Sequence, residues 1–169
     1  MPLDIDKVRF AVSHNLSIVY ERHVEVNRDY IAQKLSEIDT DAILQEEASR
    51  FTISVLSDID LDDIRNNRKK PLSSKRELEK FKELIQQGGT AYYVYYTSPT
   101  GIPGKMFQWH MPGEPGFKPI LKSKAHDIAQ AQVDRIAEIN ARVRVAAHIT
   151  REILEGLKSG RLGEMDIFT

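Results

Sequence analysis

The sequence contains no cysteine. This absence excludes a disulfide-stabilised scaffold, a cysteine-ligated zinc site and a thiol nucleophile, and it fits a reducing compartment. Long hydrophobic runs are also missing, since none approaches the roughly 18 residues that a membrane-spanning helix needs. The first residues show no basic segment followed by an apolar one, as a secretory signal would. We therefore expect a protein of the cytoplasm, or of a particle assembled in the cytoplasm, with no membrane partner.

The short motifs of common active sites are absent as well. No glycine-rich phosphate loop and no Gly-x-Ser-x-Gly elbow occurs, and no two histidines have the four-residue spacing of a zinc-binding helix. Residues 58–63 resemble the start of a calcium loop, but Asp63 stands where that loop needs glycine and Lys69 where it needs glutamate. We expect no metal, no cofactor and no enzyme, and a small hydrolase with a site assembled from distant residues stays open as an alternative.

Charge is nearly balanced in total, at −1, but it is separated along the chain. Between Glu37 and Asp63, nine acidic residues oppose Arg50 alone, which gives −8, whereas residues 64–82 carry eight basic and two acidic residues, which gives +6. The two segments could face each other within or between subunits, or the basic segment could hold the phosphates of a nucleic acid. The residues that would do so are Arg68, Lys69, Lys70, Lys75 and Arg76.

Between Ser123 and Lys158 the chain has no proline, and its first glycine is Gly156. Apolar residues recur at spacings of three and four, which predicts one long amphipathic helix, capped by Ser123 and stopped by Gly160. About 35 residues at roughly 1.5 Å each give a rod of ~50 Å, longer than the ~40 Å diameter of a compact chain of this size. The predicted buried seam consists of Ala129, Gln132, Ile136, Ile139, Val143, Ala146, Thr150, Ile153 and Leu157, widened by Val133, Ala147 and Leu154 on one side and by Ile128 and Ile149 on the other.

Apolar residues from Ile5 to Tyr30 have a mean spacing near 3.6, which predicts a second long helix from about Asp6 to Ser36. The alternation from His23 to Val26 is typical of a strand and argues against this helix. On the helical interpretation, His23 lies on the buried stripe and packs in the core. Shorter helices are predicted from Asp41 to about Ser57 and from Ser74 to Gly88.

The aromatic and β-branched run Ala91–Thr97 predicts a strand, which returns after a breaker-rich turn as Met106–His110. Both faces of this hairpin carry large side chains, and because a two-stranded hairpin is marginal alone in water, its own helices or a partner must cover it. Beside a basic segment, aromatic rings could also stack nucleic-acid bases. We predict a partner-binding surface from Tyr92, Tyr93, Tyr95, Tyr96, Phe107 and Trp109, with Ile167 and Phe168 as a tail anchor on the protein's own body or on a neighbour.

Together these patterns predict a mainly α (α+β) fold: an elongated helical bundle with two long helices, shorter helices and one β-hairpin arm. Residues 1–169 would form a single domain, with the arm at 90–111 and a C-terminal tail at 161–169. The predicted function is a non-catalytic structural subunit of a larger oligomeric assembly, for instance a ring, connector or shell component of a virion-type particle. Its partners would be protein subunits, either copies of itself or other components, and the alternative is a nucleic-acid-binding accessory protein that uses the basic segment 65–82.

Overall fold

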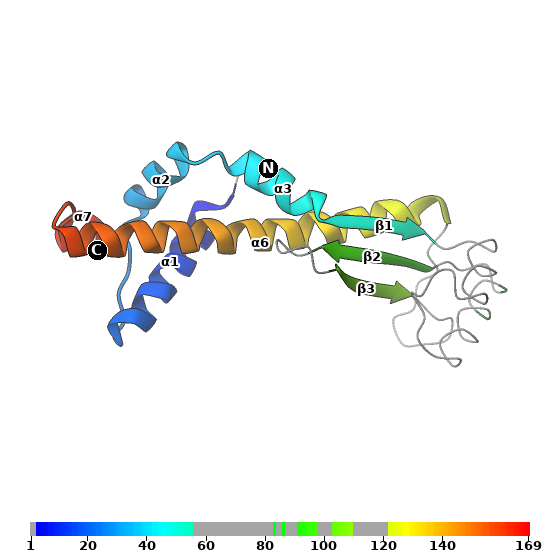
Figure 1. Cartoon of the computed structure of the whole chain (residues 1–169), viewed down its shortest axis with the longest axis horizontal. Coiled ribbons are helices and arrows are strands. Elements are labelled where there is room, and N and C mark those ends of the chain that lie inside the picture. Colours follow the sequence, from blue (N-terminus) through cyan, green and yellow to red (C-terminus); the bar gives the residue numbers. More distant parts are fainter. Residues whose placement is uncertain (1–2, 56–82, 84–85, 87–90, 98–102, 110–121) are drawn as a thin grey trace. The chain divides into compact units, whose positions relative to one another are not determined.

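The computed structural model describes residues 3–55, 83, 86, 91–97, 103–109 and 122–169. The fold is mainly helical, and the chain divides into two compact units, which we describe separately. The first unit consists of residues 1–48 and 135–169, and the second of residues 49–134. The elements in chain order are α1 (Ile5–Tyr20), α2 (Arg28–Glu37), α3 (Thr40–Ser49), β1 (Phe51–Val55), β2 (Ala91–Thr97), β3 (Pro103–Trp109), α6 (Lys122–Ser159) and α7 (Glu164–Ile167) (Figure 1).

The helix α6 confirms the predicted long helix, with 38 residues and no interruption. The helix begins at Lys122, so Ser123 lies inside its first turn. The prediction that Ser123 caps the helix is therefore wrong. Gly160 follows its end with a positive φ of 76°, a conformation that suits glycine. Residues 122–159 contribute to both units.

The buried stripe of α6 differs from the predicted seam. Buried residues recur every four positions, and because four residues turn a helix by about 400°, the buried direction advances by about 40° at each step. The predicted seam assumed one straight face, and it is wrong at Ile139 and Val143, which are 42% and 60% exposed. The buried stripe consists of Ala129, Val133, Ala137, Ala141, Val145, Ile149 and Ile153, flanked by Ala146 and Thr150. It confirms the predicted seam at Ala129, Ala146, Thr150 and Ile153.

The predicted N-terminal long helix is two helices. The helix α1 ends at Tyr20, where Glu21 adopts a left-handed conformation with φ of 53°, and Asn27 caps the start of α2. Between them lies an extended segment in which Val24 and Val26 are buried. Two β-branched residues spaced two apart can both face the core from an extended chain, but not from a helix. The side chain of His23 is 81% exposed, so the prediction of a core histidine is wrong.

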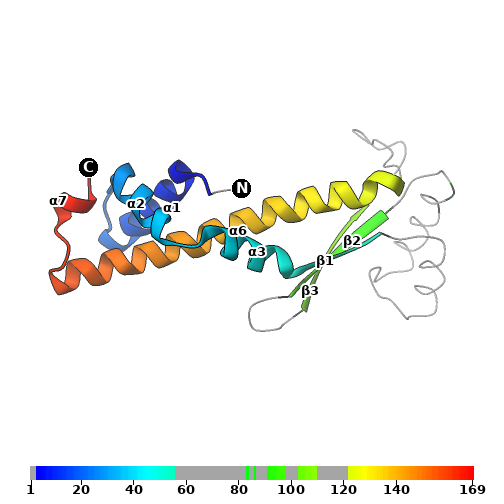
Figure 2. The ribbon, with the colours of Figure 1, turned by 90° about the horizontal axis from the view of Figure 1, so that it is seen from above.

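The core of the first unit brings together residues from both ends of the chain. Val8, Val12 and Leu16 of α1 are fully buried against a cluster that includes residues of α2, α6 and α7. Figure 2 shows α1, α2 and α7 on one side of the C-terminal half of α6. Each such side chain stabilises the fold by roughly 1.5–3 kcal/mol when it leaves water. The other members from these elements are Ile31, Ala141, Val145, Ala146, Ile149, Ile153 and Ile167.

A charged contact joins α3 to α6. Glu47 is 2% exposed, and its carboxylate accepts a hydrogen bond of 2.9 Å from Nη1 of Arg144. This hydrogen bond raises the pKa of Arg144 above its usual value, although burial acts in the opposite direction. Because a buried carboxylate without a cation is costly, Arg144 fixes the position at which α3 lies along α6.

The second unit contains a three-stranded antiparallel sheet in the order β1-β2-β3. The predicted hairpin is confirmed, with Tyr93 opposite Phe107, although β3 begins at Pro103 rather than Met106. The strand β1 pairs along β2, with Phe51 opposite Tyr96 and their ring centroids 5.0 Å apart. The prediction of a helix up to Ser57 is therefore wrong after Ser49. Phe51, Ile53 and Val55 alternate, which favours a strand once a neighbouring edge is present.

Candidate functional site: three faces of α1

The helix α1 uses each of its faces for a different purpose. Three apolar residues at a spacing of four form the buried face described above. A second series at the same spacing, Arg9, Ser13 and Ser17, carries hydrogen-bonding side chains. The third series is Phe10, His14 and Ile18, all exposed, with Phe10 and Ile18 accessible over 75% and 64% of their surface. Residues four apart lie on one side of a helix, so α1 presents a core face, a polar face and an apolar exposed face.

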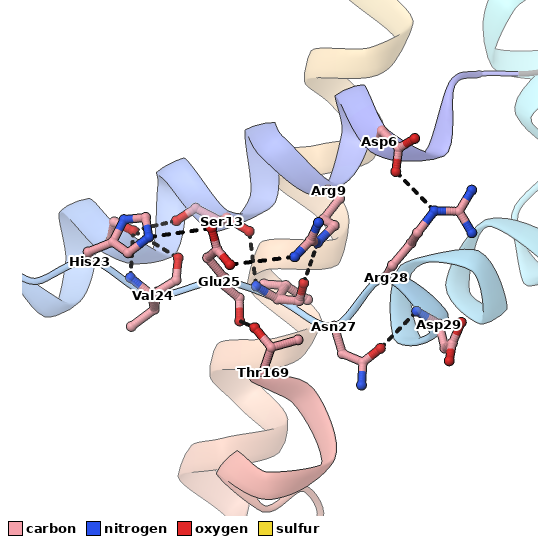
Figure 3. Close-up of polar contacts among 12 residues, drawn as sticks. Asp6, Arg9, Ser13, His23, Val24, Glu25, Asn27, Arg28, Asp29 and Thr169 are labelled. Carbon is pink, nitrogen blue, oxygen red and sulfur yellow. Dashed lines mark hydrogen bonds and ion pairs between the residues drawn. The ribbon is translucent and has the colours of Figure 1, made fainter.

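The polar face holds the backbone of the extended segment (Figure 3). Ser17 Oγ accepts a hydrogen bond of 3.1 Å from the Val24 N–H. Ser13 Oγ accepts one of 3.0 Å from the Val26 N–H, and Nε of Arg9 donates one of 2.6 Å to the Val26 carbonyl. The main-chain groups of this segment are therefore paired with side chains, as those of a strand are paired with its neighbour.

The match between helix and strand has a geometric reason. Four residues of an α-helix rise by about 6.0 Å, and two residues of a strand by about 6.6 Å. A donor or acceptor on every fourth helical residue therefore stays nearly in register with every second residue of an extended chain. Ser17 is hydrogen-bonded to Val24, and Ser13 and Arg9 are hydrogen-bonded to Val26, so the segment runs antiparallel to α1.

The other edge of the extended segment is occupied by the C-terminal tail. The Asn27 N–H donates to the Ile167 carbonyl at 2.6 Å, and the Thr169 N–H donates to the Glu25 carbonyl at 3.1 Å. Val26 and Phe168 form the antiparallel bridge between them. Ile167 is fully buried, so the tail docks on its own body. A role for Ile167 and Phe168 in binding a partner stays a prediction, which the burial of Ile167 disfavours.

Charged and polar side-chain contacts surround this arrangement at the surface. Arg28 contacts Asp6 at 2.9 Å, and the carboxylate of Glu25 lies 3.7 Å from Arg9 and 3.5 Å from His23. Most of these side chains are more than half exposed, and pairs of this kind stabilise a protein by at most about 1 kcal/mol. They orient the segment on α1 rather than hold it there.

A groove lies alongside the segment, and the exposed face of α1 borders it. The groove has a volume of about 310 Å³ and is lined by Phe10 and His14 of the exposed face together with Ser13, Ser17 and Val24. The Phe10 and His14 rings are stacked, with centroids 6.4 Å apart and an interplanar angle of 6°. Because the core face and the polar face hold α1 in place, the two rings form a flat surface that is already arranged for contact.

The structure describes some of the residues predicted to form the site, and others lie outside the described residues. Tyr92, Tyr93 and Tyr95 lie on β2, Phe107 and Trp109 lie on β3, and Tyr96 is half buried against Phe51. Their role as a partner-binding surface stays a prediction. The basic residues Arg68, Lys69, Lys70, Lys75 and Arg76, the acidic run 58–63 and most of the predicted helix 74–88 lie outside the described residues.

The exposed face of α1 was not predicted from the sequence. Phe10 is a large apolar residue that does not belong to the stripe of Val8, Val12 and Leu16, and Ile18 follows it two turns later. A second apolar series, offset from the buried one, is the signal that could have revealed this face. The spacing of Arg9, Ser13 and Ser17 could likewise have indicated a helix that pairs with an extended chain.

The chain matches no protein-family model, no curated protein sequence and no solved structure. In the part of the chain that the structure describes, no helix combines the length and apolar character needed to cross a membrane. Within the same residues, no three His, Asp or Glu side chains are grouped so that they could hold a metal ion.

Proposed function

We propose that this protein is a non-catalytic, structural subunit of a larger oligomeric assembly, bound through protein–protein contacts to copies of itself or to other components. The observation that carries the proposal is the exposed face of α1. Phe10 and Ile18 are accessible over 75% and 64% of their surface although they belong to a helix whose opposite face is fully buried. Large apolar side chains left exposed along one face of a packed helix are a feature of interaction sites.

Rigidity supports the same proposal. A surface on a well-packed helix loses little conformational freedom when a partner binds, so less of the binding free energy is lost to ordering. Aromatic residues are also enriched at the centres of interfaces, where they bury much area with few rotatable bonds. A ring, connector or shell component presents such preformed surfaces to several neighbours.

A second apolar patch fits a subunit with more than one neighbour. Ile139 and Val143 are one turn apart on α6 and are 42% and 60% exposed. Arg142 lies beside them and forms a pair of 4.0 Å with Glu138, a polar border of the kind that rims interfaces.

Static light scattering of the full chain tests the proposal. We expect a molar mass that rises above the 19.3 kDa of one chain as concentration increases from about 1 to 100 µM, the range of modest affinities. If the chain stays a monomer throughout this range, self-assembly is contradicted.

A further inference from the structure

We propose that α1 pairs with α1 of a second copy of this chain, in antiparallel orientation, about a two-fold axis that passes close to His14. This inference rests on the proposed function and names the partner and the surface. The second copy is the occupant because the exposed face of α1 is complementary to itself.

The complementarity lies in the order of five exposed residues. His14 is at the centre, Phe10 and Ile18 lie four residues before and after it, and Lys7 and Glu21 lie seven residues before and after it. When two copies of this series are laid antiparallel with the histidines opposite each other, Phe10 faces the second copy's Ile18. Lys7 then faces the second copy's Glu21. Both contacts occur twice, as an isologous interface requires.

Charge decides the orientation. In the antiparallel pair, both ends of the seam bring an ammonium group to a carboxylate, whereas a parallel pair would bring Lys7 to Lys7 and Glu21 to Glu21. Among the described residues, neither Lys7 nor Glu21 takes part in an ion pair within its own chain. Antiparallel helices also place the positive end of one helix dipole beside the negative end of the other.

Two other faces of α1 are not available for this contact. The face of Val8, Val12 and Leu16 is buried in the core, and Arg9, Ser13 and Ser17 are engaged with the extended segment. The spacings of three and four between Lys7, Phe10, His14 and Ile18 keep these residues on the third face of the helix, and Glu21 caps its C-terminal end. This seam is only about two heptads long. We therefore expect the pair to have modest affinity and to act as one of several contacts within an assembly.

Charge reversal gives the first test, with the dimerisation constant measured by sedimentation equilibrium. Lys7→Glu and Glu21→Lys should each weaken dimerisation by about tenfold, because each change creates two like-charge contacts at about 0.7 kcal/mol each. The double variant restores opposite charges in the reversed sense, so its dimerisation should return to within about twofold of the wild type. Lys158→Glu makes the same charge change at an exposed site on α6 and should have no effect. A double variant as weak as either single variant would overturn the proposal.

Cross-linking gives a second test that does not depend on affinity. Because the chain has no cysteine, each introduced thiol is unique. A mixture of Lys7→Cys and Glu21→Cys proteins should form the mixed disulfide under mild oxidation, whereas neither protein alone should form a disulfide with itself. A parallel pair gives the opposite pattern, and Met165→Cys, on an exposed side chain of α7, serves as the control for random collision.

The two proposals can fail separately. If the wild-type chain assembles but the charge variants and the disulfides do not follow this pattern, the α1 pair is wrong and the proposed function stands on another surface. If the wild-type chain is a monomer across the same concentrations, the α1 pair is also wrong. The mixed disulfide together with recovery in the double variant supports the pair.

Discussion

Ser17 Oγ on α1 accepts a hydrogen bond of 3.1 Å from the backbone N–H of Val24. A helix side chain thus takes the position that a neighbouring strand would take, and Ser13 repeats the contact with Val26 at 3.0 Å. The C-terminal tail pairs with the opposite edge of the segment. The extended segment is therefore the centre of the first unit's polar structure. It engages the polar face of α1, and the core face of α1 is buried in the hydrophobic cluster. The third face is left for contact with a partner.

We expect Ser13→Ala and Ser17→Ala each to lower the free energy of unfolding by about 2 kcal/mol, because each change leaves the N–H of a buried valine without an acceptor. Urea unfolding followed by circular dichroism measures the effect. Ser36→Ala removes an exposed hydroxyl that bonds the Gln33 carbonyl on α2, and it should change stability by less than about 0.5 kcal/mol. Equal effects of all three substitutions would show that the segment does not depend on these hydroxyls.

Gly156 is placed where the chain after α6 turns back. A Cβ at this position would lie 2.8 Å from Leu162 Cγ, and the Leu162 N–H donates to the Gly156 carbonyl at 3.0 Å. Alanine favours helices over glycine by about 1 kcal/mol, but here the close approach of Leu162 should outweigh that preference.

We therefore expect Gly156→Ala to destabilise the protein by about 1–3 kcal/mol, the usual range for an overpacked site. Hydrogen exchange should show the largest loss of protection at Asn27 and Thr169, whose N–H groups pair the tail with the segment. An alanine variant as stable as the wild type, with unchanged protection, would contradict this role of the glycine.

Tyr30 carries a polar group with no partner among the described residues: its hydroxyl oxygen is buried and accepts or donates no hydrogen bond there. A buried, unpaired hydroxyl costs free energy that its removal recovers. Tyr30→Phe should therefore raise the free energy of unfolding by about 1 kcal/mol. Thermal and urea unfolding both measure this, and a clear loss of stability would mean that the hydroxyl has a partner after all.

The same neighbourhood makes stability depend on alkaline pH. Burial raises the pKa of Tyr30, with Lys34 acting in the opposite direction. Burial lowers the pKa of Lys34, but Tyr30, Glu152 and Glu37 raise it by more, so it lies above its usual value. A raised pKa contributes stability that is complete below the unfolded-state value and is lost as pH rises through the folded-state value. We expect the free energy of unfolding to fall above about pH 10, and to fall less steeply in Tyr30→Phe. An equal slope in both proteins would contradict this assignment.

Long helical periodicity was the most reliable signal in the sequence. The helix α6 has no breaker before Gly156, and the alternating aromatic run 91–97 is a strand, because in both cases local preference and tertiary contacts agree. The prediction of one helix from Asp6 to Ser36 failed where the periods of a helix and of a strand cannot be told apart. Val24 and Val26 fit both a helical stripe and an extended chain. Phe51–Val55 forms a strand because it pairs with β2, which begins about 40 residues later in the chain.

The candidate site was harder to predict for a related reason. Whether Phe10 or Val12 faces the core depends on which elements pack against α1, and these come from the far end of the chain, as Ile149 and Ile167 do. The exposed face is therefore a consequence of long-range packing, and no local motif marks it.

Sedimentation equilibrium of Phe10→Asp beside the wild type tests directly whether the exposed face of α1 holds subunits together. Phe10 is 75% exposed, so its replacement should leave the fold intact, while the exposed Met165→Asp provides the same apolar-to-acidic change away from α1. We expect the wild type and Met165→Asp to associate as concentration rises, and Phe10→Asp to remain at the 19.3 kDa of a single chain. Association of Phe10→Asp with the wild-type constant would contradict the claim that the exposed face of α1 holds the subunits together.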